Sequence, residues 1–111
     1  MLRKTALITG ASGEIGFAAA KKLAENGYAL ILAGYRSGDV LKANAEMITK
    51  SYGVACKTFT GDLSDPDICA GLFSQIDDLD VLINNAGISR VGLLTDLSPK
   101  DWREIEGINL S

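Results

Sequence analysis

The sequence contains no histidine, and only two of its 111 residues are cysteines. Without histidine, the chain can build neither a Ser-His-Asp triad nor a histidine-based metal site. The apolar run behind the basic start of the chain breaks at Gly10, too early for a secretory signal. We therefore expect a cytoplasmic protein in which Cys56 and Cys69 are reduced thiols.

An excess of basic charge and a long apolar run are also missing. The net charge is −3, and the eleven lysines and arginines are scattered along the chain. A nucleic-acid surface would need a basic patch, and a membrane span would need a longer apolar run. We expect neither partner. The remaining composition, 47% hydrophobic and 23% charged, is typical of one small globular domain.

Short apolar runs alternate with helical patterns along the chain. The runs at residues 5–9 and 28–34 are unbroken, which favours strands buried on both faces of a parallel sheet. The predicted strands are residues 5–9, 28–34, 54–60 and 79–83. The predicted helices are residues 14–26, 40–51 and a segment that begins at Ser64-Asp65-Pro66. This alternation predicts an α/β fold with right-handed crossovers.

The spacing of apolar residues predicts which face of each helix is buried. In the first helix these residues are Ile15, Ala18, Ala19 and Leu23; in the second, Leu41, Ala45, Ile48 and Tyr52; in the third, Cys69, Leu72, Phe73 and Ile76. The stretch Ser98-Pro99-Lys100-Asp101 resembles a capping box. It predicts a fourth helix with Trp102, Ile105 and Asn109 on one face.

The stretch from Ala6 to Gly16 combines an apolar strand, a glycine-rich turn and the start of a helix. Gly10, Gly13 and Gly16 would allow a sharp bend and the close approach of a ligand. A helix that begins behind such a turn presents free N–H groups and a positive dipole end to a phosphate. The alternative is an ordinary glycine-rich loop.

Distinctive residues also follow the other predicted strands, at the edge where ligands of open parallel sheets bind. Arg36 lies twenty residues after Gly16, where an arginine accommodates the 2′-phosphate of NADP; it could also be a solvated loop residue. Asp62 could accept a hydrogen bond from an adenine amino group, or it could cap a helix or turn. The segment 84–87, Asn-Asn-Ala-Gly, could contact a cofactor or form only a tight turn.

These motifs together resemble those of the short-chain dehydrogenase/reductases. The matching stretches are Thr9-Gly10-Ala11-Ser12-Gly13-Glu14-Ile15-Gly16, Asp62-Leu63, Asn84-Asn85-Ala86-Gly87 and Ile108-Asn109-Leu110. The resemblance covers the whole chain and is strongest to bacterial 3-oxoacyl-(acyl-carrier-protein) reductases. It implies a Rossmann-type parallel sheet with flanking helices, of which four strands are present and the later strands are missing.

The resemblance also implies roles for individual residues. The pyrophosphate and ribose would be lined by Gly10, Ser12, Gly13, Ile15 and Gly16. Arg36 would hold the 2′-phosphate, so NADP(H) is favoured over NAD(H). Asp62 and Leu63 would contact the adenine, and the central ribose region would be lined by Asn85, Ala86 and Gly87. Asn109 would be the asparagine of the family's catalytic Asn-Ser-Tyr-Lys tetrad. No metal is implied.

The sequence departs from the family pattern at two places. Glu14 replaces the usual second glycine of the turn, and its carboxylate would repel a pyrophosphate unless it points to solvent. None of the three tyrosines is followed four residues later by lysine, so the catalytic Ser, Tyr and Lys are absent. We therefore expect residues 1–111 to be the amino-terminal, NAD(P)-binding fragment of a single reductase domain, with an exposed edge at its fourth strand.

The expected parent protein is a cytoplasmic homo-oligomer, a dimer or tetramer, that reduces a small or acyl-carrier-protein-linked ketone with NADPH. Two alternatives are a reductase of another carbonyl, such as the 5-aminopentanone modification of elongation factor P, and a non-catalytic NADP(H)-binding module. The 111 residues alone are expected to be inactive.

Overall fold

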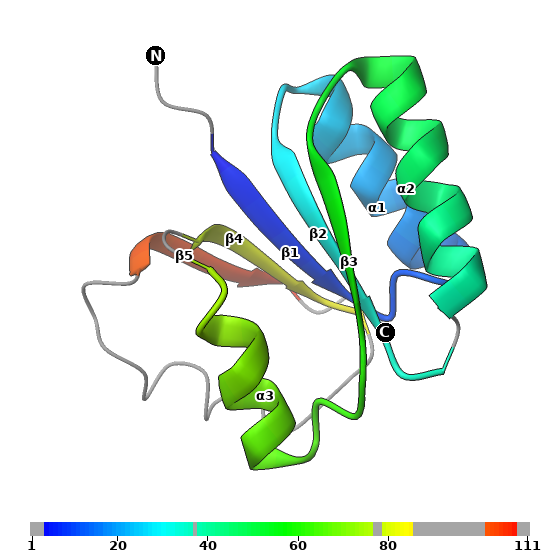
Figure 1. Cartoon of the computed structure of the whole chain (residues 1–111). Coiled ribbons are helices and arrows are strands. Elements are labelled where there is room, and N and C mark those ends of the chain that lie inside the picture. The colour runs from blue at the N-terminus through cyan, green and yellow to red at the C-terminus, as the bar shows by residue number, and fades with distance from the viewer. Residues whose placement is uncertain (1–3, 37, 77–78, 86–101, 109–111) are drawn as a thin grey trace.

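The computed structural model describes residues 4–36, 38–76, 79–85 and 102–108. These ranges form a parallel sheet with strand order β3-β2-β1-β4-β5 and three helices (Figure 1). In chain order the elements are β1 (Thr5–Thr9), α1 (Glu14–Glu25), β2 (Ala29–Gly34), α2 (Gly38–Tyr52), β3 (Cys56–Thr60), α3 (Pro66–Phe73), β4 (Leu79–Asn84) and β5 (Trp102–Ile108). The α/β class and the first four strands are as the sequence predicts.

The helices cover opposite faces of the sheet. In Figure 1, α1 and α2 lie on one side and α3 on the other. Alternate residues of β1 enter the two cores: Ile8 packs with α1 and α2, while Leu7 packs with the residues of α3. Both side chains are fully buried. This explains why the strand sequence is apolar without interruption.

The buried faces of α2 and α3 agree with the sequence prediction, apart from Tyr52, which is 39% exposed at the end of α2. The start of α3 agrees as well. Asp65 is its N-cap and accepts a hydrogen bond of 2.9 Å from the Asp67 N–H, and Pro66 occupies the first turn. Of the described helices, none has the length and apolar character needed to cross a bilayer.

The predicted buried face of α1 is right only in part: Ala19 and Leu23 are half-buried and pack against the core, but Ala18 is exposed. Ile15 is 56% exposed, and the buried residues are Gly16, Ala20 and Ala24. The reason lies at the start of the helix, where Gly16 must face the preceding turn at close range. That contact fixes the rotation of α1 about its axis and turns Ile15 outward.

The helix predicted from Trp102 onward is also wrong, because residues 102–108 form strand β5. This strand pairs in parallel with β4, with an irregularity in register between Leu79 and Val81. Gly107 weakens a helix by about 1 kcal/mol relative to alanine, and β4 offers unpaired backbone groups along its outer edge. The pairing covers that edge, so the predicted exposure of the fourth strand is wrong too. Residues 98–101 and Asn109 lie outside the described ranges.

Candidate functional site

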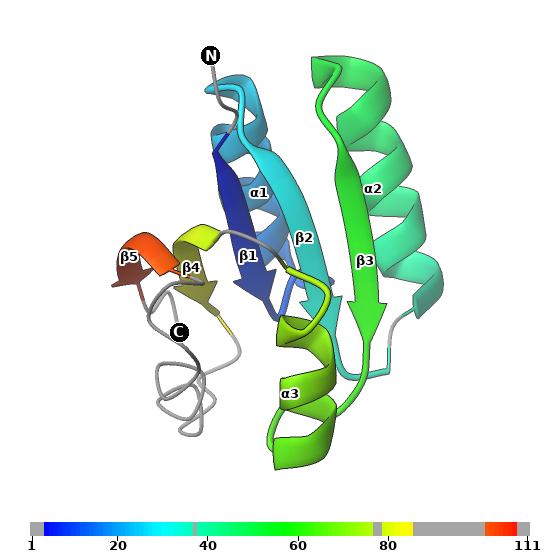
Figure 2. The same ribbon diagram turned by 60° about the vertical axis from the view of Figure 1, so that its left-hand side comes forward.

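The carboxyl ends of β1, β2 and β3 point toward the same edge of the sheet (Figure 2). A cavity of about 450 Å³ lies there, lined by Thr9, Gly10, Ser12, Ala33, Gly34, Tyr35, Arg36, Gly61, Asp62 and Leu63. Each of the three strands ends in or is followed by a lining glycine: Gly10, Gly34 and Gly61. A Cβ at Gly34 would press on Leu41 of α2, and a Cβ at Gly61 would press on Ile68 of α3, so close packing of the helices requires glycine at both positions.

The glycine turn after β1 is closely packed against α1. Gly10 has a φ of 62°, a conformation that favours glycine. A Cβ at Gly16 would collide with the Gly10 carbonyl oxygen and lie 2.9 Å from the Ala11 Cα. Both glycines are therefore required by the backbone, one by its dihedral angle and the other by the close crossing of helix and turn.

Hydrogen bonds from three elements hold the backbone of this turn. The Asn85 side-chain amide, just after β4, donates to the Gly10 carbonyl at 3.1 Å. The Ala11 N–H donates to the Ala33 carbonyl of β2, also at 3.1 Å. The Asn44 side-chain amide of α2 donates to the Ala11 carbonyl at 3.3 Å. The turn is thus fixed by neighbours on both sides of β1.

The first turn of α1 has no side-chain cap, because Gly13 occupies the N-cap position. The leading N–H groups of a helix have no acceptor within it, so an anion placed there would gain hydrogen bonds and the favourable end of the dipole. Glu14 is exposed. A solvent-facing carboxylate leaves this helix end compatible with a phosphate.

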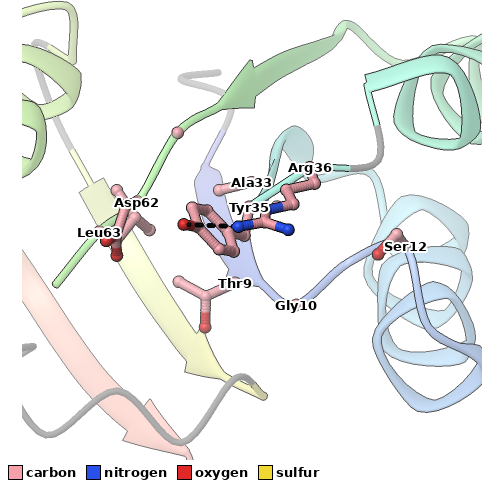
Figure 3. Close-up of a pocket in the computed structure, with 10 residues that line it drawn as sticks. Thr9, Gly10, Ser12, Ala33, Tyr35, Arg36, Asp62 and Leu63 are labelled. Atoms are coloured by element: carbon pink, nitrogen blue, oxygen red, sulfur yellow. Dashed lines mark hydrogen bonds between the residues drawn. The ribbon is translucent and has the colours of Figure 1, made fainter.

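Tyr35 and Arg36 follow β2 and interact with each other (Figure 3). The Arg36 guanidinium lies 4.7 Å from the centre of the Tyr35 ring and donates to its phenol oxygen at 3.3 Å. This hydrogen bond raises the pKa of Arg36 above its ordinary value. Both side chains are exposed, which leaves a permanent cation at the mouth of the cavity.

Asp62 lies across the cavity from Arg36, next to Leu63 (Figure 3). Its Oδ1 accepts hydrogen bonds from the Ser64 hydroxyl and from the Ser64 N–H, the latter at 3.0 Å. These bonds lower the pKa of the Asp62 carboxyl. The side chain therefore stabilises a turn, as one of the two sequence interpretations holds, and it also lines the cavity.

The structure brings together most of the residues that the sequence singled out. Those lining the cavity are Gly10, Ser12, Arg36, Asp62 and Leu63. Gly13, Ile15 and Gly16 lie in the adjoining start of α1, and Asn85 reaches the turn through the Gly10 carbonyl. Ala86, Gly87 and Asn109 lie outside the described residues. The binding and catalytic roles of all the predicted site residues stay predictions.

Sequence reasoning missed two contributions. The sequence predicts no role of its own for Tyr35, although its phenol oxygen accepts a hydrogen bond from Arg36. Asn44 was not singled out at all, although it contacts the glycine turn. Its one local signal is its residue type, since asparagine favours caps and turns over helix interiors.

The strand order and the glycine turn at the carboxyl edge define a Rossmann-type α/β protein. The chain belongs to the short chain dehydrogenase family, which it matches over residues 4–111. This is a family of NAD(P)-dependent oxidoreductases that act on CH–OH groups. The family expected from the motifs is confirmed.

Curated relatives match nearly the whole chain. It is 38% identical over 112 residues to 3-oxoacyl-(acyl-carrier-protein) reductase FabG of Aquifex aeolicus, covering 97% of this chain and 45% of that protein. It is 35% identical over 114 residues to acetoacetyl-CoA reductase of Paracoccus denitrificans, covering 99% of this chain and 45% of that protein. The chain thus spans about half the length of these relatives.

A solved structure supports the fold. L-sorbose reductase from Gluconobacter frateurii, complexed with NADPH and L-sorbose, superposes with a TM-score of 0.71 at 29% identity. The match covers 77% of this chain and 34% of that one. The similarity therefore also lies in part of a longer chain.

Proposed function

We propose that residues 1–111 form the cofactor-binding portion of an NADPH-dependent carbonyl reductase. The observation that carries this proposal is the joint lining of one cavity by the glycine turn, Arg36 and Asp62. These residues come from three separate strand ends and would contact three separate parts of a dinucleotide. The NADPH bound in the L-sorbose reductase structure supports the same assignment.

The proposed contacts follow the chemistry of each group. The uncapped start of α1 and the turn residues Gly10 and Ser12 would receive the pyrophosphate. Arg36 would hold the 2′-phosphate, because a guanidinium matches phosphate geometry and stays charged at every working pH. Asp62 and Leu63 would hold the adenine. Ile15 would line the pyrophosphate and ribose with the turn, and Asn85, Ala86 and Gly87 would line the central ribose region.

NADPH, when bound, supplies the hydride that reduces a carbonyl carbon. A proton must also reach the carbonyl oxygen from a positioned acid. We infer a β-keto thioester substrate, because the similar proteins include a 3-oxoacyl-(acyl-carrier-protein) reductase and an acetoacetyl-CoA reductase. We assign Asn109 to support of the proton relay.

Replacing Arg36 by alanine tests the cofactor assignment. The substitution should weaken NADPH binding about tenfold or more, because a hydrogen bond to a charged group contributes about 1.5–3 kcal/mol. NADH binding should change less than about twofold, since NADH has no 2′-phosphate. Isothermal titration of both cofactors against wild type and variant measures the difference.

Lys50→Ala is the matched control, because it also removes one exposed positive charge, at the last turn of α2. It should leave both affinities near those of the wild type. Equal losses of NADPH and NADH affinity in Arg36→Ala would contradict a 2′-phosphate contact.

A second candidate function is a module that binds NADP(H) without reducing a substrate. The cavity lined by the glycine turn, Arg36 and Asp62 would serve such a module equally well. The protein as its gene encodes it should be assayed for NADPH oxidation with acetoacetyl-CoA. Turnover supports the reductase; tight NADPH binding without turnover on any carbonyl supports the module.

A further inference from the structure

We propose that Asn44 is a positioning residue that orients the Ser12 N–H for the cofactor pyrophosphate. The proposal rests on the proposed function and adds to it a residue from α2, an element that contributes nothing to the lining of the cavity. Asn44 acts through the backbone of the glycine turn and does not touch the cofactor.

The contact is specific to one peptide group. The Asn44 side-chain amide donates to the Ala11 carbonyl at 3.3 Å. The two residues are 33 positions apart in the chain, and the bond is partly buried. Asn44 is half-buried within α2, and asparagine has a lower helix propensity than alanine. Its side chain contacts the glycine turn outside the helix.

The geometry of the peptide gives this bond its effect. The Ala11 carbonyl and the Ser12 N–H belong to one peptide group, and the described chain contains no cis peptide bond. In a planar trans peptide these two groups point in opposite directions. When Asn44 draws the carbonyl toward α2, the Ser12 N–H points away from α2, and Ser12 lines the cavity.

The preceding peptide of the turn is held in the same manner. The Gly10 carbonyl accepts from Asn85, and the Ala11 N–H of that peptide donates to Ala33. Two successive peptide groups are therefore fixed before any ligand arrives. A preorganised donor binds an anion more tightly, because less freedom is lost on binding.

The test compares Asn44→Ala with Asn26→Ala in the protein as its gene encodes it. Asn26 is a matched control, since its side-chain amide also donates to a backbone carbonyl, that of Lys22, at 2.8 Å, near the opposite end of α1. Neither change alters net charge. Two probes are titrated: NADP⁺, which carries the pyrophosphate, and adenosine 2′-monophosphate, which carries only the adenine, ribose and 2′-phosphate.

Asn44→Ala should weaken NADP⁺ binding about three- to tenfold, the range for one hydrogen bond, and should change adenosine 2′-monophosphate binding less than about twofold. Asn26→Ala should change neither. An equal loss for both probes would show general damage to the site and would overturn the proposal, as would unchanged NADP⁺ binding in Asn44→Ala.

The two proposals fail in different ways. If the wild-type protein binds neither probe, the proposed function fails and the role of Asn44 fails with it. If the wild type binds NADP⁺ and Asn44→Ala binds it as tightly as Asn26→Ala does, the proposed function stands and the positioning role of Asn44 is overturned.

Discussion

Asp62 shows how a single side chain can couple the site to stability. Its carboxylate accepts two hydrogen bonds from Ser64, so its pKa in the folded chain is lower than the ordinary value of 3.8. A group with a lowered folded pKa contributes stability above its unfolded pKa, and this contribution is lost as the pH falls through the folded pKa. The relevant window therefore lies below about pH 4.

We predict that Asp62→Asn reduces the dependence of stability on pH in that window. Asparagine does not titrate, so the free energy of unfolding should fall less between pH 6 and pH 3 in the variant than in the wild type. Urea denaturation without cofactor measures both. Ser64→Ala, which removes one of the two donors, should give an intermediate slope. Identical pH dependence in wild type and Asp62→Asn would refute the linkage.

At the scale of single residues, the sequence predicts the site residues whose type and position are distinctive, and it does not predict those whose role depends on a contact. Arg36 and Asp62 are predictable because their charges follow predicted strands. The role of Tyr35 depends on where its ring lies relative to Arg36, and the role of Asn44 depends on a contact across 33 residues of sequence. The first role depends on side-chain conformation and the second on the tertiary fold, so neither role follows from the spacing of residues in the sequence.

At the scale of elements, α1 offers a sharp test of which face is buried. Ala20 is fully buried, whereas Ala18, on the face that the spacing of apolar residues favours, is exposed. Overpacking a buried position costs about 1–3 kcal/mol, and a surface change costs less than about 0.5 kcal/mol. We predict that Ala20→Leu destabilises the chain by that larger amount and Ala18→Leu does not.

Chemical denaturation of both variants provides the measurement. Both substitutions replace alanine by leucine, and they lie two residues apart on the same helix. The change in helix propensity is therefore the same in both variants and cancels in the comparison. A larger loss for Ala18→Leu would restore the face expected from the apolar spacing and would disagree with the contact between Gly16 and the turn.

Strands β1 to β4 and helices α1 to α3 were predictable because each carries its own periodicity and its own start or stop residue. The rotation of α1 was not, since it depends on a backbone crossing at Gly16. The sequence predicts a helix for Trp102–Ile108 because apolar residues recur there at helical spacing. Its strand conformation follows from the edge that β4 offers, which is a property of the sheet and not of the segment.

At the scale of the whole molecule, we expect residues 1–111 to bind the cofactor without reducing a carbonyl substrate. The printed residues include the proposed cofactor contacts but no Tyr-x-x-x-Lys motif to deliver a proton. We predict that a protein limited to residues 1–111 shows no steady NADPH oxidation with an acetoacetyl thioester. Absorbance at the NADPH band follows the reaction, with the Aquifex aeolicus reductase as the positive control. Sustained turnover by the 111 residues would contradict the prediction.

The position of β1 in the middle of the sheet has a consequence for synthesis on the ribosome. β1 pairs on one side with β2, which follows after a single helix, and on the other side with β4, which ends at Asn84. Translation adds about 5–20 residues per second. The edge of β1 that pairs with β4 therefore stays unpaired for roughly 3–10 s after β2 has emerged, at those rates. During that interval the nascent chain exposes an apolar strand that a chaperone could shield.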